Sequence, residues 1–207
     1  MGPTYFRKTA LMLASGALVA LTTIHGASAA DRIRMHGTVE SLDGDTLKIK
    51  SPDGKDVTVT MKSGMNVLGV KNASAADIKP GDFVGVGSQP TASGVNGAVQ
   101  VVIFPASMKG TGEGDRPWDV KPNGSMTNAT VANAVKDVNG PTLTLAYKGG
   151  ERKISIPDGT KIVALAPTTK DDLKAGAGVS VQGVMSGDNM VAADRVSVGL
   201  DGATPPN

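Results

Sequence analysis

The sequence contains no cysteine and few histidines or aromatic residues. Without cysteine the chain cannot form a disulfide, use a thiolate nucleophile, or build a cysteine-based zinc or iron–sulfur site. The 207 residues include only two histidines, and their aromatic residues are one Trp, two Tyr and three Phe. A histidine-rich metal centre is therefore excluded. A surface that stacks nucleic-acid bases would need more aromatic rings than these.

Long apolar runs are also absent, apart from one at the N-terminus. Arg7 and Lys8 precede an apolar run over residues 9–24, and the small-residue stretch HGASAAD follows it. This order is typical of a secretory signal peptide, with cleavage after Ala29 or Ala30. The run of about 16 residues is shorter than the roughly 20 needed to cross a bilayer. We therefore expect a periplasmic mature protein with no stable membrane insertion.

The balance of charges does not indicate a nucleic-acid partner. The chain has 21 basic and 19 acidic residues, so 19 of each remain once the two basic residues of the signal are removed. Binding to a phosphate backbone requires a clustered surplus of Lys and Arg. The mature chain is close to neutral, and its charges are mixed along its length. The sequence therefore predicts no nucleic-acid binding.

After the signal, the sequence contains an internal repeat. Three pairs of blocks correspond: GTVESLDGDTLKIK (37–50) with NAVKDVNGPTLTLA (133–146), DIKPGDFVGV (77–86) with DLKAGAGVSV (172–181), and AVQVVIF (98–104) with AADRVSV (192–198). The offset between the copies stays at 94 to 96 residues. Chance matches would not keep so constant an offset, so we expect a duplicated unit.

Each copy has the pattern of β-strands. Apolar and polar residues alternate, as at Val57, Val59 and Met61, and glycine-containing turns recur every 8 to 12 residues or so. Five or six strands with one helical turn, expected in ASAADIKPG, are typical of a small OB-like barrel. The inward candidates of the second copy are Val135, Leu143, Leu145, Ile154, Ile156, Ile162 to Leu165, Val179, Val181, Val196 and Val198.

These patterns predict an all-β fold of two tandem antiparallel OB-like β-barrels with 5–6 strands each. The predicted organisation is a signal peptide (1–30), a first barrel (31–106), a Gly/Pro-rich linker with an RPWD motif (107–128), a second barrel (129–199) and a disordered tail (200–207).

The repeat blocks, the central GEGDRPWD and the following MTNATV resemble a bacterial exported family of domains of unknown function built on OB-like barrels. The resemblance covers nearly the whole mature chain. Full-length relatives are sometimes labelled metal ABC transporter permease, a label that a chain without several membrane spans does not support. In that family a histidine often stands where this chain has Asp115, so the resemblance implies no metal role here. It also implies no catalytic residues.

The segment GEGDRPWDVKPNG contains the only tryptophan of the chain. We favour Trp118 as an interdomain anchor whose ring packs between the barrels, with Arg116 paired to Asp115, Asp119 or an acidic residue of a barrel. A ligand- or partner-binding loop that also uses Glu113 is a second possibility. A catalytic pair, Asp115 with Asp119, is a third. Glycosidases place such pairs in a rigid cleft lined with aromatic rings, unlike a Gly/Pro-rich segment.

Methionine and histidine form the remaining candidate site. Thioethers and imidazole without cysteine are the ligand set of a Cu(I) carrier, and Met35 lies beside His36. Neighbouring residues of a strand face opposite sides, however, so these two side chains cannot easily share one metal. Methionine also fills irregular gaps in protein cores. Metal binding at His36 and Met35 is therefore the weaker interpretation.

Together these features predict a non-catalytic periplasmic binding or scaffold protein without a cofactor. Its partner would be an envelope protein, a glycan or a small ligand. One alternative is a periplasmic metal-handling accessory protein for copper or another divalent cation. A carboxylate-dependent hydrolase is the third hypothesis, although neither a G-x-S-x-G motif nor a phosphate-binding GKS or GKT loop occurs.

Overall fold

The structure is a computed structural model that describes residues 32–137 and 140–206, so the predicted signal peptide lies outside the described residues. This part of the chain forms thirteen β-strands and three single-turn 3-10 helices, with no α-helix among the residues described. The predicted all-β class is therefore confirmed. No helix in the described ranges is both long and apolar enough to cross a membrane.

The strands follow one another along the chain with short connections. They are β1 (Arg32–Asp43), β2 (Thr46–Lys50), β3 (Asp56–Met61), β4 (Val67–Asn72), β5 (Phe83–Gln89), β6 (Asn96–Phe104), β7 (Gly114–Trp118), β8 (Gly124–Asp137), β9 (Gly140–Tyr147), β10 (Gly150–Ser155), β11 (Lys161–Ala166), β12 (Gly178–Gly187) and β13 (Met190–Gly199). The 3-10 helices are η1 (Ala75–Asp77), η2 (Ala106–Met108) and η3 (Lys170–Asp172). The helical turn expected in ASAADIKPG is η1.

Five strands from the two ends of the chain form a closed ring that we call the terminal lobe. Its pairings run β1–β2, β2–β3, β3–β13, β13–β12 and β12–β1, and only β3–β13 is parallel. The side chains that alternate inward make one hydrophobic core, in which Leu47, Ile49 and Val59 from the first strands meet Val181 and Val196 from the last. Burial of these apolar side chains stabilises the lobe.

Five strands from the middle of the chain form a second ring, the central lobe. Its pairings run β8–β9, β9–β10, β10–β6, β6–β5 and β5–β8. The β10–β6 contact is parallel and closes the ring through two residue pairs, Ile154 with Asn96 and Ser155 with Gly97. Its core is separate from that of the terminal lobe, and Leu143, Leu145 and Ile154 are buried there.

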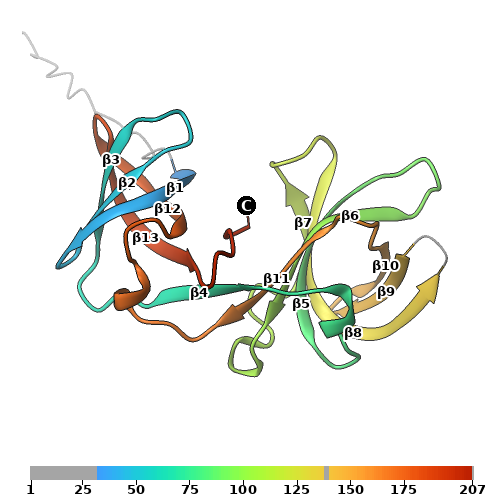
Figure 1. The fold of residues 1–207 in the computed structure, drawn as a ribbon. Helices are drawn as coiled ribbons and strands as arrows, with labels where there is room; N and C mark the ends of the chain where they lie inside the picture. Colours follow the sequence, from blue (N-terminus) through green and yellow to red (C-terminus); the bar gives the residue numbers. More distant parts are fainter. Residues whose placement is uncertain (1–31, 138–139, 207) are drawn as a thin grey trace, which may run out of the picture.

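Strands β4 and β11 connect the two lobes. They pair with each other in antiparallel orientation, while β4 also pairs with β13 of the terminal lobe and β11 with β6 of the central lobe. In Figure 1 the two strands run side by side between the lobes, and the C-terminal segment ends in the space beside them. The sheet therefore continues from one lobe into the other without an edge between them.

The chain segments that form each lobe differ from the predicted domains. The segment 31–106 gives β1–β3 to the terminal lobe and β5–β6 to the central lobe. The segment 129–199 gives β8–β10 to the central lobe and β12–β13 to the terminal lobe. The reason lies in β4 and β11, which are each six residues long. An extended strand of that length advances by about 20 Å. Each strand thus carries the chain out of one ring, and the strands after it pair in the other.

Val135 differs from its predicted inward position, because it is 55% exposed while Val131 is buried. Val131 pairs with Leu145 just before a bulge in β8, as Val39 pairs with Ile49 just before a bulge in β1. The β8–β9 hairpin extends beyond this point further than the β1–β2 hairpin does. Val131 therefore takes the core position that the sequence match assigned to Val135.

The end of the chain is packed, in contrast to the predicted disordered tail of residues 200–207. The Leu200 amide donates to the Val70 carbonyl at 2.8 Å, and Ala203 is 3% exposed. Pro205 is also buried, and its carbonyl accepts a hydrogen bond from Lys161 Nζ at 3.4 Å. Glycines explain the packing, because the missing side chain of Gly199 leaves room for the Ala203 carbonyl.

Candidate functional site

The RPWD motif belongs to a β-hairpin of the central lobe. Strand β7 pairs antiparallel with the beginning of β8, from Gly114 with Asn128 to Trp118 with Gly124. The same part of β8 pairs with β5 on its other side. Much of the predicted linker 107–128 is therefore sheet, because β7 pairs with β8 and β8 also pairs with β5.

Trp118 anchors this hairpin. Its side chain is buried, with 6% exposed, and its ring lies over Gly87 of β5. A Cβ atom at Gly87 would approach the ring to 2.8 Å, so glycine makes room for the indole there. Gly87 and Gly124, the glycines nearest the ring, both belong to the central lobe. Within the described residues the indole Nε1 is buried without a hydrogen-bond partner.

Asp115 holds the hairpin through its carboxylate. Its Oδ1 accepts hydrogen bonds from Ser125 Oγ at 2.5 Å and Thr127 Oγ1 at 2.6 Å, and its Oδ2 is paired with the Arg152 guanidinium on β10. Burial raises the pKa of Asp115, but the hydrogen bonds from Ser125, Thr127 and Arg152 outweigh it and leave the pKa below its ordinary value. The carboxylate is therefore ionised at neutral pH and already engaged in structural contacts.

The other polar residues of the motif point in different directions. Glu113 Oε1 accepts a hydrogen bond from the Lys148 amide at 3.0 Å, and Arg116 donates to the Gly112 carbonyl at 3.0 Å. No carboxylate of the described chain lies within ion-pair distance of Arg116, so the predicted pairing with Asp115 or Asp119 is not formed.

Asp119 and Asp115 do not meet in one cleft. Asp119 is 91% exposed and lies 4.0 Å from Arg34 Nη1 of β1, whereas Asp115 is engaged with β8 and β10. The geometry that a carboxylate-dependent hydrolase would need is therefore not present at this pair.

A cleft between the lobes brings together polar side chains of which the sequence singled out only Arg116. Its volume is about 390 Å³. The terminal lobe contributes Arg34, Gln182 and Arg195 to its wall, and the central lobe contributes Arg116 and Gln100. The described residues that line it include three arginines and no Asp or Glu. The charged side chains of the described lining are therefore all positive.

Strand register explains how the terminal lobe places its arginines. Arg34 of β1 lies opposite Gln182 of β12, which in turn lies opposite Arg195 of β13. Their neighbours Met35, Val181 and Val196 pack in or against the core, so this row belongs to the outer face that lines the cleft. The alternation of each strand was visible in the sequence. The pairing of β1 with β12 was not, because it joins segments nearly 150 residues apart.

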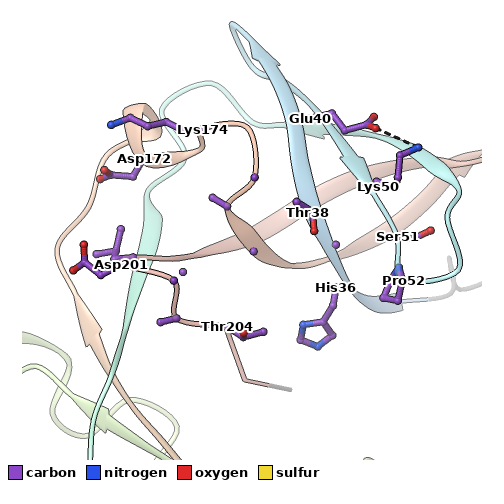
Figure 2. A pocket seen from close by; sticks show the side chains of 18 of the residues that line it. His36, Thr38, Glu40, Lys50, Ser51, Pro52, Asp172, Lys174, Asp201 and Thr204 are labelled. Carbon is purple, nitrogen blue, oxygen red and sulfur yellow. Dashed lines mark ion pairs between the residues drawn. The ribbon is translucent and has the colours of Figure 1, made fainter.

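A wider groove on the terminal lobe holds His36, which projects from β1 toward Thr204 in Figure 2. The volume of this open groove is about 1080 Å³. Met35 packs against the core while His36 lines the groove, which confirms that the two side chains face opposite sides.

The charges of this groove largely neutralise one another. Lys50 Nζ lies 3.3 Å from Glu40 Oε1 and 2.5 Å from Asp56 Oδ1, and these contacts raise the pKa of Lys50. Hydrogen bonds from Thr168 and from the Thr169 amide lower the pKa of Asp172. No group of three or more His, Asp or Glu side chains suited to a metal occurs among the residues that the structure describes. The cleft between the lobes is therefore the stronger candidate for ligand binding.

Comparison with protein-family models, curated proteins and solved structures finds no significant match for this chain. The resemblance to an exported OB-like family stays a prediction. The candidate site accordingly depends on the cleft geometry and on the charges of its lining residues.

Proposed function

We propose that the protein is a non-catalytic binding protein of the cell envelope, with a small ligand held in the cleft between the terminal and central lobes. One observation carries this proposal: polar side chains of both lobes converge on a cavity that no acidic side chain of the described lining neutralises. Ligand sites commonly lie between structural units and have volumes of about 300–1,000 Å³. The cleft volume of about 390 Å³ falls in that range.

The cellular location is part of the proposal. The basic, apolar and small-residue regions of segment 1–30 support export to the periplasm. A chain without cysteine would not depend on the redox state of that compartment.

We also propose that the lobes are two OB-like barrels derived from one duplicated segment. The matching order of strand pairings supports this, because three consecutive strands and two distant ones form each ring. A small ligand between the lobes would then contact both copies. The metal-handling alternative has less support, because Met35 packs against a core and His36 lies in a groove of compensated charges.

The test is native mass spectrometry of the mature protein after incubation with a small-molecule extract of the bacterial envelope. We expect a retained small molecule in the wild type and its loss in Ser197→Trp, because Ser197 lines the cleft and an indole would fill it. Ser41→Trp is the matched control, since Ser41 is exposed on β1 away from the cleft. Equal retention by both variants would contradict the proposal, provided that both unfold cooperatively.

A further inference from the structure

Within the described residues, two arginines of the terminal lobe, Arg34 and Arg195, lack the close ion pairs that other arginines of this protein form. Arg32 is paired with Asp194 on β13, and Arg152 with Asp115. By contrast, no carboxylate among the described residues lies within 4.0 Å of Arg195, and the contact of Arg34 is a 4.0 Å approach to the highly exposed Asp119. Exposed pairs of that kind contribute little free energy.

Arg34 and Arg195 flank Gln182 from the two neighbouring strands. Two strand spacings separate their backbones by about 10 Å. Both side chains line the cleft, so an anion placed between them can interact with two positive charges. Each guanidinium carries five N–H donors in a planar fork that matches carboxylate and phosphate oxygens.

Arg116 approaches the same cavity from the central lobe. Among the residues described, its guanidinium donates one hydrogen bond, to the Gly112 carbonyl, so most of its donors remain available. Ser180, which is 5% exposed, adds a buried hydroxyl to the lining. An anionic group in the cleft would therefore receive donors from both lobes.

Apolar side chains make up another part of the lining. Leu68 of β4 and Leu165 of β11 contribute from the two connecting strands, and Phe104 contributes from the end of β6. All three are partly exposed in the structure, so a ligand can cover them. At roughly 30 Å³ per water molecule, the cavity has the volume of about a dozen waters. That volume suits an anionic group together with a short apolar body.

We infer that the ligand is a small amphipathic anion, in which a carboxylate or phosphate group meets Arg34, Arg195 and Arg116 and an apolar body covers the leucines of β4 and β11. This inference rests on the proposed function and names the class of its ligand. It excludes cations and neutral glycans as the main occupants of the cleft.

Isothermal titration calorimetry of the mature protein tests the inference with four probes: octanoate, octyl phosphate, 1-octanol and inorganic phosphate. We expect both amphipathic anions to bind. Octanol lacks the charge and inorganic phosphate lacks the apolar body, so each should bind at least tenfold more weakly. The relative affinities of octanoate and octyl phosphate then show which anionic group the cleft prefers. Raising the salt concentration should weaken the binding of both.

Arg34→Gln and Arg195→Gln should each weaken binding of the amphipathic anions at least tenfold, because each substitution removes a charge-assisted contact. Arg32→Gln is the matched control: it makes the same change on β1 at an arginine that is already paired with Asp194. It should leave the affinity within about twofold. Thermal unfolding of the three variants shows whether each keeps the fold.

Binding of octanol as tight as that of octanoate would overturn the inference, and so would equal effects of Arg32→Gln and Arg195→Gln. Failure of both amphipathic anions to bind would overturn it as well. The proposed function fails separately, when Ser197→Trp retains the envelope ligand as the wild type does. The two failures can therefore be distinguished.

Discussion

At the scale of single residues, Trp118 has the clearest structural role. Its ring covers Gly87 and is almost fully buried. We expect Trp118→Ala to lower the free energy of unfolding by about 3–5 kcal/mol, as typical aromatic truncations do. Trp118→Phe should cost much less, because it keeps a ring at the contact and removes an N–H that has no partner in the described structure.

Urea unfolding measures the free energy of unfolding of both variants. In the wild type, tryptophan fluorescence reports only on the surroundings of Trp118, because the chain has a single tryptophan. A blue-shifted emission that moves to longer wavelength on unfolding is the expected result. Emission typical of a water-exposed indole, with unchanged stability in Trp118→Ala, would show that the hairpin is not anchored in this way.

Asp115 gives a pH-dependent prediction. Its pKa is lower in the folded protein than the ordinary value, mainly because the hydrogen bonds from Ser125 and Thr127 outweigh burial. Its contribution to stability is therefore complete above the unfolded pKa and is lost as the pH falls through the folded pKa. We expect Asp115→Asn to lower the free energy of unfolding by about 1 kcal/mol at pH 7.

The difference between wild type and Asp115→Asn should shrink below about pH 4, where the unfolded carboxyl takes up its proton. Urea unfolding between pH 3 and pH 7 measures it. Asp119→Asn is the control and should have almost no effect at any of these pH values, because Asp119 is 91% exposed. A constant penalty for Asp115→Asn across the range would contradict the assigned ionisation.

Part of the candidate site could be predicted from single residues, and part could not. The importance of Trp118 followed from its rarity and its large apolar surface, and the ring is buried. The prediction placed it between the barrels, whereas the glycines nearest to it, Gly87 and Gly124, both belong to the central lobe.

Of the three arginines that line the cleft, Arg116 was singled out, but as the partner of an acidic residue and not as part of a cleft. Arg34 and Arg195 were not recognised, because each is an ordinary polar residue on its own strand. Only the pairing of β1 with β12 and of β12 with β13 brings these two together.

At the scale of elements, the contact between β5 and β7 depends on Gly87. Gly87→Ala would place a Cβ atom 2.8 Å from the Trp118 ring. We expect a loss of about 1–3 kcal/mol, the usual cost of overpacking. Gly150→Ala is a suitable control, because a Cβ atom there would make only ordinary contacts with Tyr147, the nearest at 3.5 Å.

A double-mutant cycle separates this contact from a general effect on strand β5. In the Trp118→Ala background, Gly87→Ala should cost little or nothing, because the ring that it would strike is absent. Stability is again measured by urea unfolding. A cost that stays the same in both backgrounds would show that Gly87 is needed for another reason.

The strands themselves were predictable because alternation is a local property. Val57, Val59 and Met61 are buried as their spacing predicts, and so are Leu143 and Leu145. The position of Val135 was not predictable, since it depends on a bulge and on the length of a hairpin. Which strands pair with one another could also not be predicted. The sequences of β4 and β11 have the same alternating pattern whether the chain turns back into the same lobe or crosses to the other lobe.

At the scale of the whole molecule, the exchange of strands makes the two halves of the chain interdependent. The segments 31–106 and 129–199 each contain three strands of one ring and two of the other. Neither should fold alone, because one ring would lack two strands and the other three, and both cores would be exposed. Far-UV circular dichroism and proton NMR of the separate segments would measure this.

The mature chain should unfold in one cooperative transition, and an equimolar mixture of the two segments should recover some of its NMR dispersion. A well-dispersed spectrum from the isolated segment 31–106 would contradict the exchange, because that segment would then close its own ring.

The most direct test of ligand binding between the lobes is an amide NMR titration of the mature protein with octyl phosphate. We predict that the largest shifts fall at Arg34, Gln182 and Arg195 of the terminal lobe and at Arg116 of the central lobe, all of which line the cleft. Shifts confined to the groove around His36, or no shifts in the cleft at saturating octyl phosphate, would contradict it.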